Sequence, residues 1–317
     1  MMDCFMGLDS GGSKTECVLC DREGHILHYD LGKGCNAQDL GYEVVEKRLS
    51  ELVRAGAAAA PGPIWGVYAA LAGIGPKKEF PANCIAPFVS PETNLRVLED
   101  GPIIISSMLG NGDGCSLIAG TGSSVYVRKA GKVAAKIGGR GYLIDTAGSG
   151  FEIGRDGIAA AYRALDGQGE DTVLVQKVTD YMEGRPFGQW RARIYAPEIG
   201  GRRFIAAFAP RVMEAWQEGD RIASDIVDFA AEGQARMVRA AAKHFDSDFF
   251  VVCSGGLHLH YPRYTALIQS KCPPQARLLS AAAAPVYGAV VEALLDAGIP
   301  VTDQTRENFV RDYAKFR

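Results

Sequence analysis

The sequence of 317 residues lacks several patterns that would assign it to a particular class of protein. It has no run of Lys or Arg, and its net charge is −3, so it offers no electrostatic basis for binding nucleic acid or a membrane surface. Its start has neither the charged nor the long apolar segment of a signal peptide. The longest apolar stretch, 278–295, is interrupted by Ser280, Pro285 and Glu292. We therefore expect a cytoplasmic protein without nucleic-acid or membrane partners.

Several catalytic and metal-binding motifs are also missing. The run 11–15 does not have the G-x-x-x-x-G-K-[ST] spacing of a P-loop, and no G-x-S-x-G hydrolase motif occurs. His258 and His260 lie two apart, but no cluster of Cys, Asp or Glu accompanies them. Cys17 and Cys20 form a C-x-x-C pair within an expected strand, where residues three apart point to opposite faces. We therefore predict buried, reduced thiols rather than a metal site.

Glycine is abundant, with 38 residues, and it is concentrated where apolar, strand-like runs end. The first such pattern is a strand at 4–8, a polar glycine loop at 9–15, a strand at 17–20, a turn at 21–24 and a strand at 25–29. The same succession recurs between 116 and 137. Two copies of one supersecondary unit indicate two related lobes.

The remaining pattern indicates an α/β architecture. Further strands are expected at 64–71, 95–98 and 249–253. Apolar residues at helical spacing predict helices over 151–165, 173–182, 203–216 and 222–245, with closing helices at 285–295 and 305–316. Strands that alternate with helices are typical of α/β proteins, and the chain length predicts about two domains.

Three polar glycine loops, at 9–15, 120–123 and 254–256, each follow an apolar strand. Glycine lets an anion approach backbone N–H groups, and ligands of open α/β sheets bind at the carboxyl ends of strands. Phosphoryl transfer needs such donors around the nucleotide phosphates. A tight turn without a ligand is the alternative for any single loop, but three loops in this order favour a phosphate-binding protein.

Two aspartates at strand ends are candidates for the chemistry. Asp9 precedes the first loop, where a carboxylate could hold Mg²⁺ through water, and the alternative is a loop-capping role. Asp100 precedes an expected helix and is placed to accept the proton of an attacking hydroxyl. The alternative for Asp100 is stabilisation of the helix dipole. Beside the phosphate loops we favour the base role, with Glu99, on the other face, as the weaker candidate.

The sequence resembles the BadF/BadG/BcrA/BcrD ATPase family, and within it the N-acetylglucosamine kinase-like sugar kinases, over nearly the whole chain. The motifs that carry the resemblance are Asp9-Ser10-Gly11-Gly12-Ser13-Lys14-Thr15, Gly34-Cys35-Asn36-Ala37, Leu71-Ala72-Gly73, Asp100, Ile118-Ala119-Gly120-Thr121-Gly122-Ser123, Ser254-Gly255-Gly256 and Pro285-Val286-Tyr287-Gly288-Ala289. It implies a two-lobed actin/hexokinase-like ATPase fold with duplicated ribonuclease-H-like domains. The N-terminal lobe is expected over 1–105, joined by the C-terminal helix at about 297–317, and the C-terminal lobe over 106–296.

The resemblance also implies roles for individual residues. Asp100 corresponds to the family's catalytic aspartate. The implied phosphate ligands are Ser10, Gly11, Gly12, Ser13, Lys14, Thr15, Gly120, Thr121, Gly122 and Ser123, while Gly255 and Gly256 flank the adenosine. The implied sugar ligands are Asn36, Asp100, Thr121, Gly139, Gly141, Asp145 and Thr146. ATP and Mg²⁺, the latter near Asp9, are the expected cofactors, and a homodimer is the implied assembly.

One stretch departs from the family pattern. Arg140 replaces a Trp, and Asp145-Thr146-Ala147 replaces Gly-Asp-Glu, whose acidic residues normally help to bind the sugar. Asp145 could substitute from one position earlier, and the identity of the sugar stays open.

We predict ATP-dependent phosphorylation of a sugar or amino sugar, similar to N-acetylglucosamine or glucosamine, with Asp100 as the base. One alternative is an ATP-driven activator of an acyl-CoA dehydratase or reductase, which needs paired, exposed cysteines for an iron–sulfur cluster. The other alternative is a catalytically altered sugar sensor.

Overall fold

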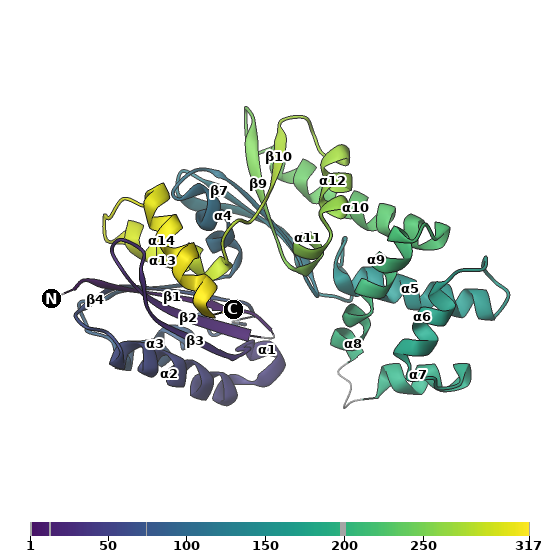
Figure 1. The fold of residues 1–317 in the computed structure, drawn as a ribbon, viewed down its shortest axis with the longest axis horizontal. Coiled ribbons are helices and arrows are strands. Elements are labelled where there is room, and N and C mark those ends of the chain that lie inside the picture. The colour runs from purple at the N-terminus through teal and green to yellow at the C-terminus, as the bar shows by residue number, and fades with distance from the viewer. Residues whose placement is uncertain (1, 13, 74, 197–200, 317) are drawn as a thin grey trace. The chain divides into compact units, whose positions relative to one another are not determined.

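The computed structural model describes residues 2–12, 14–73, 75–196 and 201–316. The chain forms two compact units. The first unit contains residues 1–114, 130–132 and 281–317, and the second contains 115–129 and 133–280. Each unit is built around a five-stranded sheet (Figure 1). Among the described residues, no helix has the length and apolar character that a membrane-spanning helix needs.

The sheet of the first unit has the strand order β3-β2-β1-β4-β5. Its strands are β1 (Cys4–Ser10), β2 (Lys14–Asp21), β3 (Ile26–Lys33), β4 (Ile64–Leu71) and β5 (Asn94–Leu98). β1, β2 and β3 pair antiparallel, whereas β4 is parallel to both β1 and β5. The three parallel strands therefore end at the same edge of the sheet.

Helices cover both faces of this sheet. They are α1 (Ala37–Leu40), α2 (Tyr42–Ala58), α3 (Phe80–Ile85), α4 (Gly101–Leu109), α13 (Pro285–Asp296) and α14 (Asp303–Tyr313). Alternation along the strands divides the core in two, because successive side chains point to opposite faces. Phe5 packs in the cluster that contains Val290 of α13, while Met6 packs in the cluster that contains Leu49 of α2.

Cys17 and Cys20 confirm this alternation. Both lie in β2 and both are buried. Cys17 belongs to the core cluster on the α2 face, and Cys20 belongs to the cluster on the α13 face. The two thiols therefore point to opposite sides of the sheet, as the strand prediction requires.

Close backbone packing places α13 in the first unit. A Cβ on Gly7 of β1 would lie 2.8 Å from the Val290 side chain of α13. A Cβ on Gly288 would collide with the backbone of Ile103 in α4. This grouping differs from the expected lobe boundary at residue 296, because α13 covers the sheet of the first unit.

The second unit repeats the sheet topology of the first. Its strands are β6 (Gly114–Ala119), β7 (Ser123–Lys129), β8 (Lys132–Gly138), β9 (Phe249–Ser254) and β10 (Ala276–Ser280), in the order β10-β9-β6-β7-β8. β9 is parallel to both β6 and β10. Strands β6 to β10 thus take the places that β1 to β5 have in the first sheet, and the repeat in the sequence is a repeat of topology.

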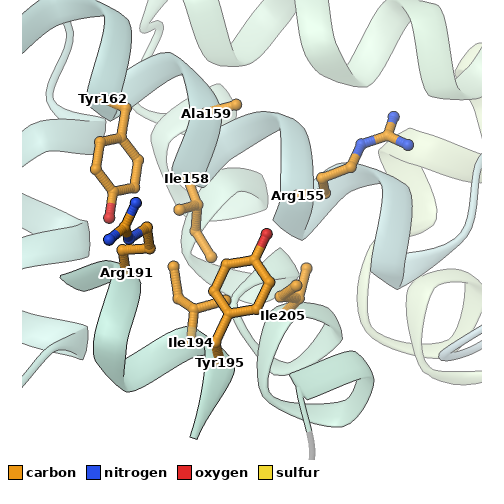
Figure 2. Close-up of a pocket in the computed structure, with 8 residues that line it drawn as sticks. All are labelled: Arg155, Ile158, Ala159, Tyr162, Arg191, Ile194, Tyr195 and Ile205. Atoms are coloured by element: carbon orange, nitrogen blue, oxygen red, sulfur yellow. The ribbon is translucent and has the colours of Figure 1, made fainter. Parts of the chain in front are cut away.

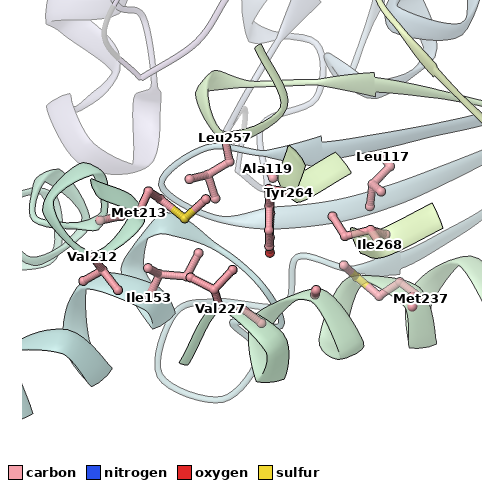
Figure 3. Packing of buried hydrophobic residues seen from close by; sticks show 14 of the residues in the cluster. Leu117, Ala119, Ile153, Val212, Met213, Val227, Met237, Leu257, Tyr264 and Ile268 are labelled. Carbon is pink, nitrogen blue, oxygen red and sulfur yellow. The ribbon is translucent and has the colours of Figure 1, made fainter. Parts of the chain in front are cut away.

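The described residues of the second unit form eight α-helices. They are α5 (Gly150–Leu165), α6 (Leu174–Tyr181), α7 (Phe187–Tyr195), α8 (Gly201–Ala207), α9 (Ala209–Gln217), α10 (Arg221–Ala242), α11 (Gly256–His260) and α12 (Pro262–Lys271). Their core joins Leu117 of β6 to Ile153, Val212 and Val227 of three helices (Figure 3).

The prediction of a single helix over 203–216 is wrong. The segment forms two helices that meet at Phe208, with Pro210 in the first turn of α9. Proline lacks an N–H group and its ring clashes with the carbonyl four residues earlier, so it begins a new helix instead of continuing the old one.

Candidate functional site

The first polar glycine loop joins β1 to β2 in the first unit. The hydroxyls of Ser10 and Thr15 lie 2.9 Å apart, and the Thr15 hydroxyl also donates to the carbonyl of Lys33 at 3.0 Å. The N–H of Gly11 donates to the carbonyl of Lys14 at 3.0 Å. Ser13 lies outside the described residues. These bonds hold Gly11 close to Lys14 and Ser10 close to Thr15, and Ser10 and Thr15 are both buried.

Lys14, an expected phosphate ligand, forms an ion pair with Glu16 at 2.6 Å. Glu16 is buried and also accepts hydrogen bonds from the hydroxyls of Tyr29, at 3.0 Å, and Tyr313. Burial alone would raise the pKa of Glu16, but the hydrogen bonds from Lys14 and the two tyrosines outweigh it and lower the pKa. The charge of Lys14 is therefore already compensated within the fold.

Two aspartates lie near one another at the carboxyl edge of the first sheet. Asp9 pairs in register with Ala70 of β4, which pairs with Leu98 of β5, and Asp100 follows two residues later. Burial, followed by the charges of Asp100 and Glu16, raises the pKa of Asp9 to about 7. Two adjacent carboxylates at a strand edge are suited to a divalent cation, which would relieve their repulsion.

Asp100 occupies the N-cap of α4, and within the described residues its side chain makes no capping hydrogen bond to that helix. Asp100 is partly buried, whereas the neighbouring Glu99 is exposed. Capping therefore does not occupy the Asp100 carboxylate, and the two acidic residues have different surroundings.

Asn36 follows β3 and lies against the loop after β4. Gly73 in that loop has a φ of +67°, and a Cβ there would collide with the Asn36 amide. A Cβ on Gly34 would likewise collide with the carbonyl of Gly12. The loop after β4 is tied to β1, because the N–H of Ala72 donates to the carbonyl of Ser10 at 2.8 Å. The first unit thus packs Asn36 and the first glycine loop together.

The second polar glycine loop, 120–123, joins β6 to β7 in the second unit. The carbonyl of Gly120 accepts a hydrogen bond from the N–H of Gly150 at 2.8 Å, and the Ser123 hydroxyl donates to the carbonyl of Ala147 at 2.5 Å. Thr121 is exposed at the tip of the loop. The loop and the start of α5 are therefore held together as one structure.

The third glycine loop lies beside the second. β6 and β9 are parallel neighbours, with Ile118 opposite Ser254, so both loops leave the same sheet edge. Gly255 has a φ of +98°, and a Cβ there would collide with the backbone of Ala119. Gly256 then begins α11. The structure brings together the two loops that were expected to hold the phosphates and the adenosine.

The stretch that departs from the family pattern forms a tight turn. Gly139 and Gly141 have φ values of +69° and +114°, which favour glycine. A carboxylate oxygen of Asp145 accepts a hydrogen bond from the N–H of Arg140 at 3.0 Å. The N–H of Asp145 donates back to the carbonyl of Gly141 at 2.9 Å. One oxygen of Asp145 is thus used to hold the turn.

Glu152 is a residue of this site that the sequence interpretation missed. Its buried carboxylate accepts hydrogen bonds from the Thr146 hydroxyl at 3.1 Å and the Gly148 N–H at 2.6 Å. Ser149 caps α5 by accepting the N–H of Glu152 at 3.1 Å. The S-x-x-E spacing of a capping box was the available signal. A carboxylate thus contacts Thr146 and Gly148, on either side of Ala147. Positions 146 and 147 are those where the family pattern has its acidic residues.

Arg202 of α8 is a second missed residue. Its guanidinium lies over the Tyr142 ring, 5.3 Å from the centroid, and Nη2 lies 3.5 Å from where a Cβ of Gly122 would be. Its Nε is buried without a hydrogen-bond partner among the described residues. A positive charge therefore lies beside the second glycine loop, and no sequence motif marks it.

The histidine pair is divided between the interior and the surface. His258 is buried, with Nδ1 3.0 Å from the Thr265 hydroxyl, and burial lowers its pKa to about 4. His260 is exposed. The part of the chain that is described contains no group of three or more potential His, Cys, Asp or Glu metal ligands.

Comparison with known proteins identifies the family. The sequence profile of the BadF/BadG/BcrA/BcrD ATPase family matches residues 6–293. A curated relative, the N-acetylmuramic acid/N-acetylglucosamine kinase of Clostridium acetobutylicum, is 26% identical over 261 residues, which cover 76% of this chain and 80% of the relative. The resemblance identified from the sequence motifs is thereby confirmed.

Solved structures identify the fold. A protein of Chromobacterium violaceum described as a candidate N-acetylglucosamine kinase has a TM-score of 0.72 at 20% identity, covering 92% of this chain and 98% of its own. The ROK family glucokinase of Streptomyces griseus, solved with glucose and AMPPNP, has a TM-score of 0.60 at 16% identity, with the same coverage of 92% and 98%. The predicted α/β actin/hexokinase-like fold is confirmed.

Proposed function

The chain belongs to the BadF/BadG/BcrA/BcrD ATPase family, and we propose that it is an ATP-dependent kinase for a hydroxyl of a sugar or amino sugar. The observation that carries this proposal is the adjacent pair Asp9 and Asp100 at the carboxyl edge of the first sheet. The named activity of the C. acetobutylicum relative supports an amino sugar as acceptor. The first and second units are the two proposed lobes.

In the proposed mechanism, Asp100 accepts the proton of the acceptor hydroxyl. The hydroxyl oxygen forms the new bond to the γ-phosphorus, and the bond from that phosphorus to the ADP oxygen breaks. Asp9 would hold Mg²⁺ through water, and the ion would neutralise charge on the phosphate oxygens. A nearby cation also favours the ionised form of Asp9, whose pKa is about 7 in the free protein.

The glycines of the phosphate loops support close approach of a ligand. A Cβ on Gly120 would meet no described atom within 4 Å, and the φ of Gly120 is outside the left-handed region. Among the described residues, a Cβ on Gly11 would meet the carbonyl of Lys14 at 3.8 Å and no other atom within 4 Å. The described part of the fold therefore has room for a side chain at both positions. A phosphate that approaches the backbone would not leave that room.

Arg202 is proposed to contact a phosphate at the second loop. Its guanidinium lies beside Gly122, and stacking on Tyr142 orients it. Lys14 was also expected to contact a phosphate, but its charge is already paired with Glu16. Arg202 is proposed to supply the positive charge for the phosphates. Arginine presents several N–H donors in a planar fork, which suits phosphate oxygens.

For the acceptor, we propose that the 139–149 turn and Asn36 contact the sugar. Glu152 accepts hydrogen bonds from Thr146 and Gly148 and thereby fixes the conformation of this turn. Asp145 keeps one oxygen for ligand contact after it accepts the Arg140 N–H. The negative charge of the family's acidic pair is thus supplied here by Asp145 and Glu152.

The burial of the cysteines favours the kinase over the electron-transfer activator. Seven of the eight cysteines are buried, and Cys272 is partly buried. An iron–sulfur cluster shared between subunits needs thiolates that reach the surface. The pKa of Cys272 is raised to about 11 by burial, so its thiol is protonated at neutral pH.

A coupled assay of ADP release with Mg²⁺ tests the proposal. The panel is N-acetylglucosamine, glucosamine, glucose, N-acetylmannosamine, N-acetylmuramic acid and buffer alone. We expect ADP release that depends on one of the amino sugars. Hydrolysis at the same rate in buffer alone would support the activator. ATP binding without turnover on any sugar would support the sensor.

A further inference from the structure

A cavity of about 330 Å³ opens in the second unit between α5, α7 and α8 (Figure 2). Its described lining is Arg155, Ile158, Ala159, Tyr162, Arg191, Ile194, Tyr195 and Ile205. None of these residues belongs to the loops at 120–123 or 139–149. Its volume lies at the lower end of the ~300–1,000 Å³ range of small-molecule pockets. The cavity is therefore a separate potential binding site with room for a small ligand.

Two hydrogen-bond donors lie together at one end of the cavity. The Tyr162 hydroxyl is buried and has no hydrogen-bond partner among the described residues. Figure 2 shows this hydroxyl directed toward Arg191. Burial raises the pKa of Tyr162, and the charge of Arg191 opposes that shift, which places the guanidinium within electrostatic range. A buried donor without an acceptor is costly, so this end of the cavity is suited to an acceptor group.

The two arginines of the lining differ in their charge compensation. Arg155 pairs with Asp156 at 2.7 Å and lies 3.9 Å from Glu152. Arg191 is exposed and forms no ion pair with the residues that the structure describes. Arg191, which pairs with no described carboxylate, is therefore at the Tyr162 end, where the charge of Asp166 also acts on Tyr162. The remainder of the described lining is Arg155, Ala159, Tyr195 and three isoleucines.

We propose that this cavity binds a small amphipathic carboxylate. Its apolar body packs against Ile158, Ile194 and Ile205. Its carboxylate accepts a hydrogen bond from the Tyr162 hydroxyl and pairs with Arg191, whose planar fork matches the two carboxylate oxygens. A neutral ligand of the same shape would leave the Arg191 charge without a counter-ion.

Isothermal titration calorimetry with octanoate and octanamide, without nucleotide or sugar, tests the proposal independently of kinase activity. We expect octanoate to bind and octanamide to bind roughly tenfold more weakly, because hydrogen bonds to charged groups are the stronger ones. Tyr162→Phe and Arg191→Met should each weaken octanoate binding by roughly tenfold. Ala159→Trp fills the cavity and should abolish binding.

The matched control is Arg185→Met, which removes an exposed arginine outside the cavity. It should leave the affinity for octanoate unchanged. The proposal is overturned if wild-type protein does not bind octanoate, or if the amide binds equally well. It is also overturned if Tyr162→Phe and Arg191→Met, both folded by circular dichroism, keep the wild-type affinity.

Discussion

The carboxylate of Glu152 accepts a hydrogen bond from the backbone N–H of Gly148 at 2.6 Å, so a helix residue holds the turn that precedes its own helix. The carbonyl of Gly148 is held from the other side by the Gln234 amide, at 2.7 Å. Gly148 has a φ of +67°, and a Cβ there would collide with Gln234. The turn at 146–149 is therefore fixed by contacts from α5 and α10.

Glu152→Gln removes the charge from this arrangement. We expect the free energy of unfolding to fall by about 1–3 kcal/mol, because a hydrogen bond to a charged acceptor is lost inside the protein. We also expect the KM for the sugar to rise while the Kd for ATP stays within about twofold. Chemical denaturation and steady-state kinetics measure the two effects. Glu170→Gln, which changes an exposed carboxylate, is the control. Equal stability and KM in both variants would contradict the role of Glu152.

Asp100→Asn tests the general base. The amide cannot accept the proton, so kcat should fall by about 10²–10⁴. ATP affinity should stay nearly unchanged. Glu99→Gln, which alters the exposed neighbour, should retain activity. The variant has a second readout, because loss of the Asp100 charge should lower the pKa of Asp9. Retained turnover in Asp100→Asn would remove it from the base role.

Asp9 should make stability depend on pH. Its pKa is raised from 3.8 to about 7, so between these values the folded protein holds a proton that the unfolded chain has released. The contribution of Asp9 to the free energy of unfolding therefore decreases as pH rises through this window. At pH 8 without Mg²⁺, Asp9→Asn should be more stable than wild type by roughly 1–4 kcal/mol.

Comparison of wild type with Asp9→Asn isolates the contribution of Asp9 to the pH dependence of stability. The pKa of His258 is lowered from 6.5 to about 4, so its contribution to the free energy of unfolding has the opposite pH dependence and decreases as pH falls through that window. This contribution is the same in wild type and in Asp9→Asn. Thermal unfolding from pH 4 to 8 measures the difference in stability between the two proteins. This difference should become smaller when Mg²⁺ and ATP are added. A difference that does not vary with pH would show that Asp9 titrates normally.

Two glycine-to-alanine substitutions separate folding from ligand binding. Gly120→Ala should leave the midpoint of thermal unfolding unchanged, because a Cβ has room there, but it should weaken ATP binding. Gly255→Ala should lower the free energy of unfolding by about 1–3 kcal/mol, since it combines a left-handed φ of +98° with a collision against Ala119. If Gly120→Ala binds ATP as tightly as wild type, close phosphate approach at this loop is excluded.

Arg202→Met tests the charge beside the second loop. We expect weaker binding of ATP and ADP, with adenosine binding unchanged, because in the proposed complex only the phosphates would contact the guanidinium. Isothermal titration with the three ligands measures this difference. Arg211→Met is the control, since Arg211 is exposed on α9 and pairs with Glu214 at 3.1 Å. A uniform loss for all three ligands would indicate a structural role instead.

Local patterns in the sequence were sufficient to predict the elements that carry the glycine loops. The strands that became β1, β6 and β9 were predicted because apolar runs end in polar glycine segments. α5 and α10 were predicted from apolar residues at helical spacing. The positions of Cys17 and Cys20 on opposite faces of the sheet were predicted from strand alternation alone. Each of these features depends on neighbours a few residues apart, which the sequence shows directly.

Only the tertiary structure decided which distant residues meet. Asp9 and Asp100 are far apart in the sequence, and they come together because β4 pairs with both β1 and β5. Arg202 lies beside Gly122 because α8 packs along the start of α5. α13 belongs to the first unit because Gly7, which has no side chain, allows this helix to pack closely against β1. Such contacts depend on the order of strands and on backbone spacing, which no local periodicity records.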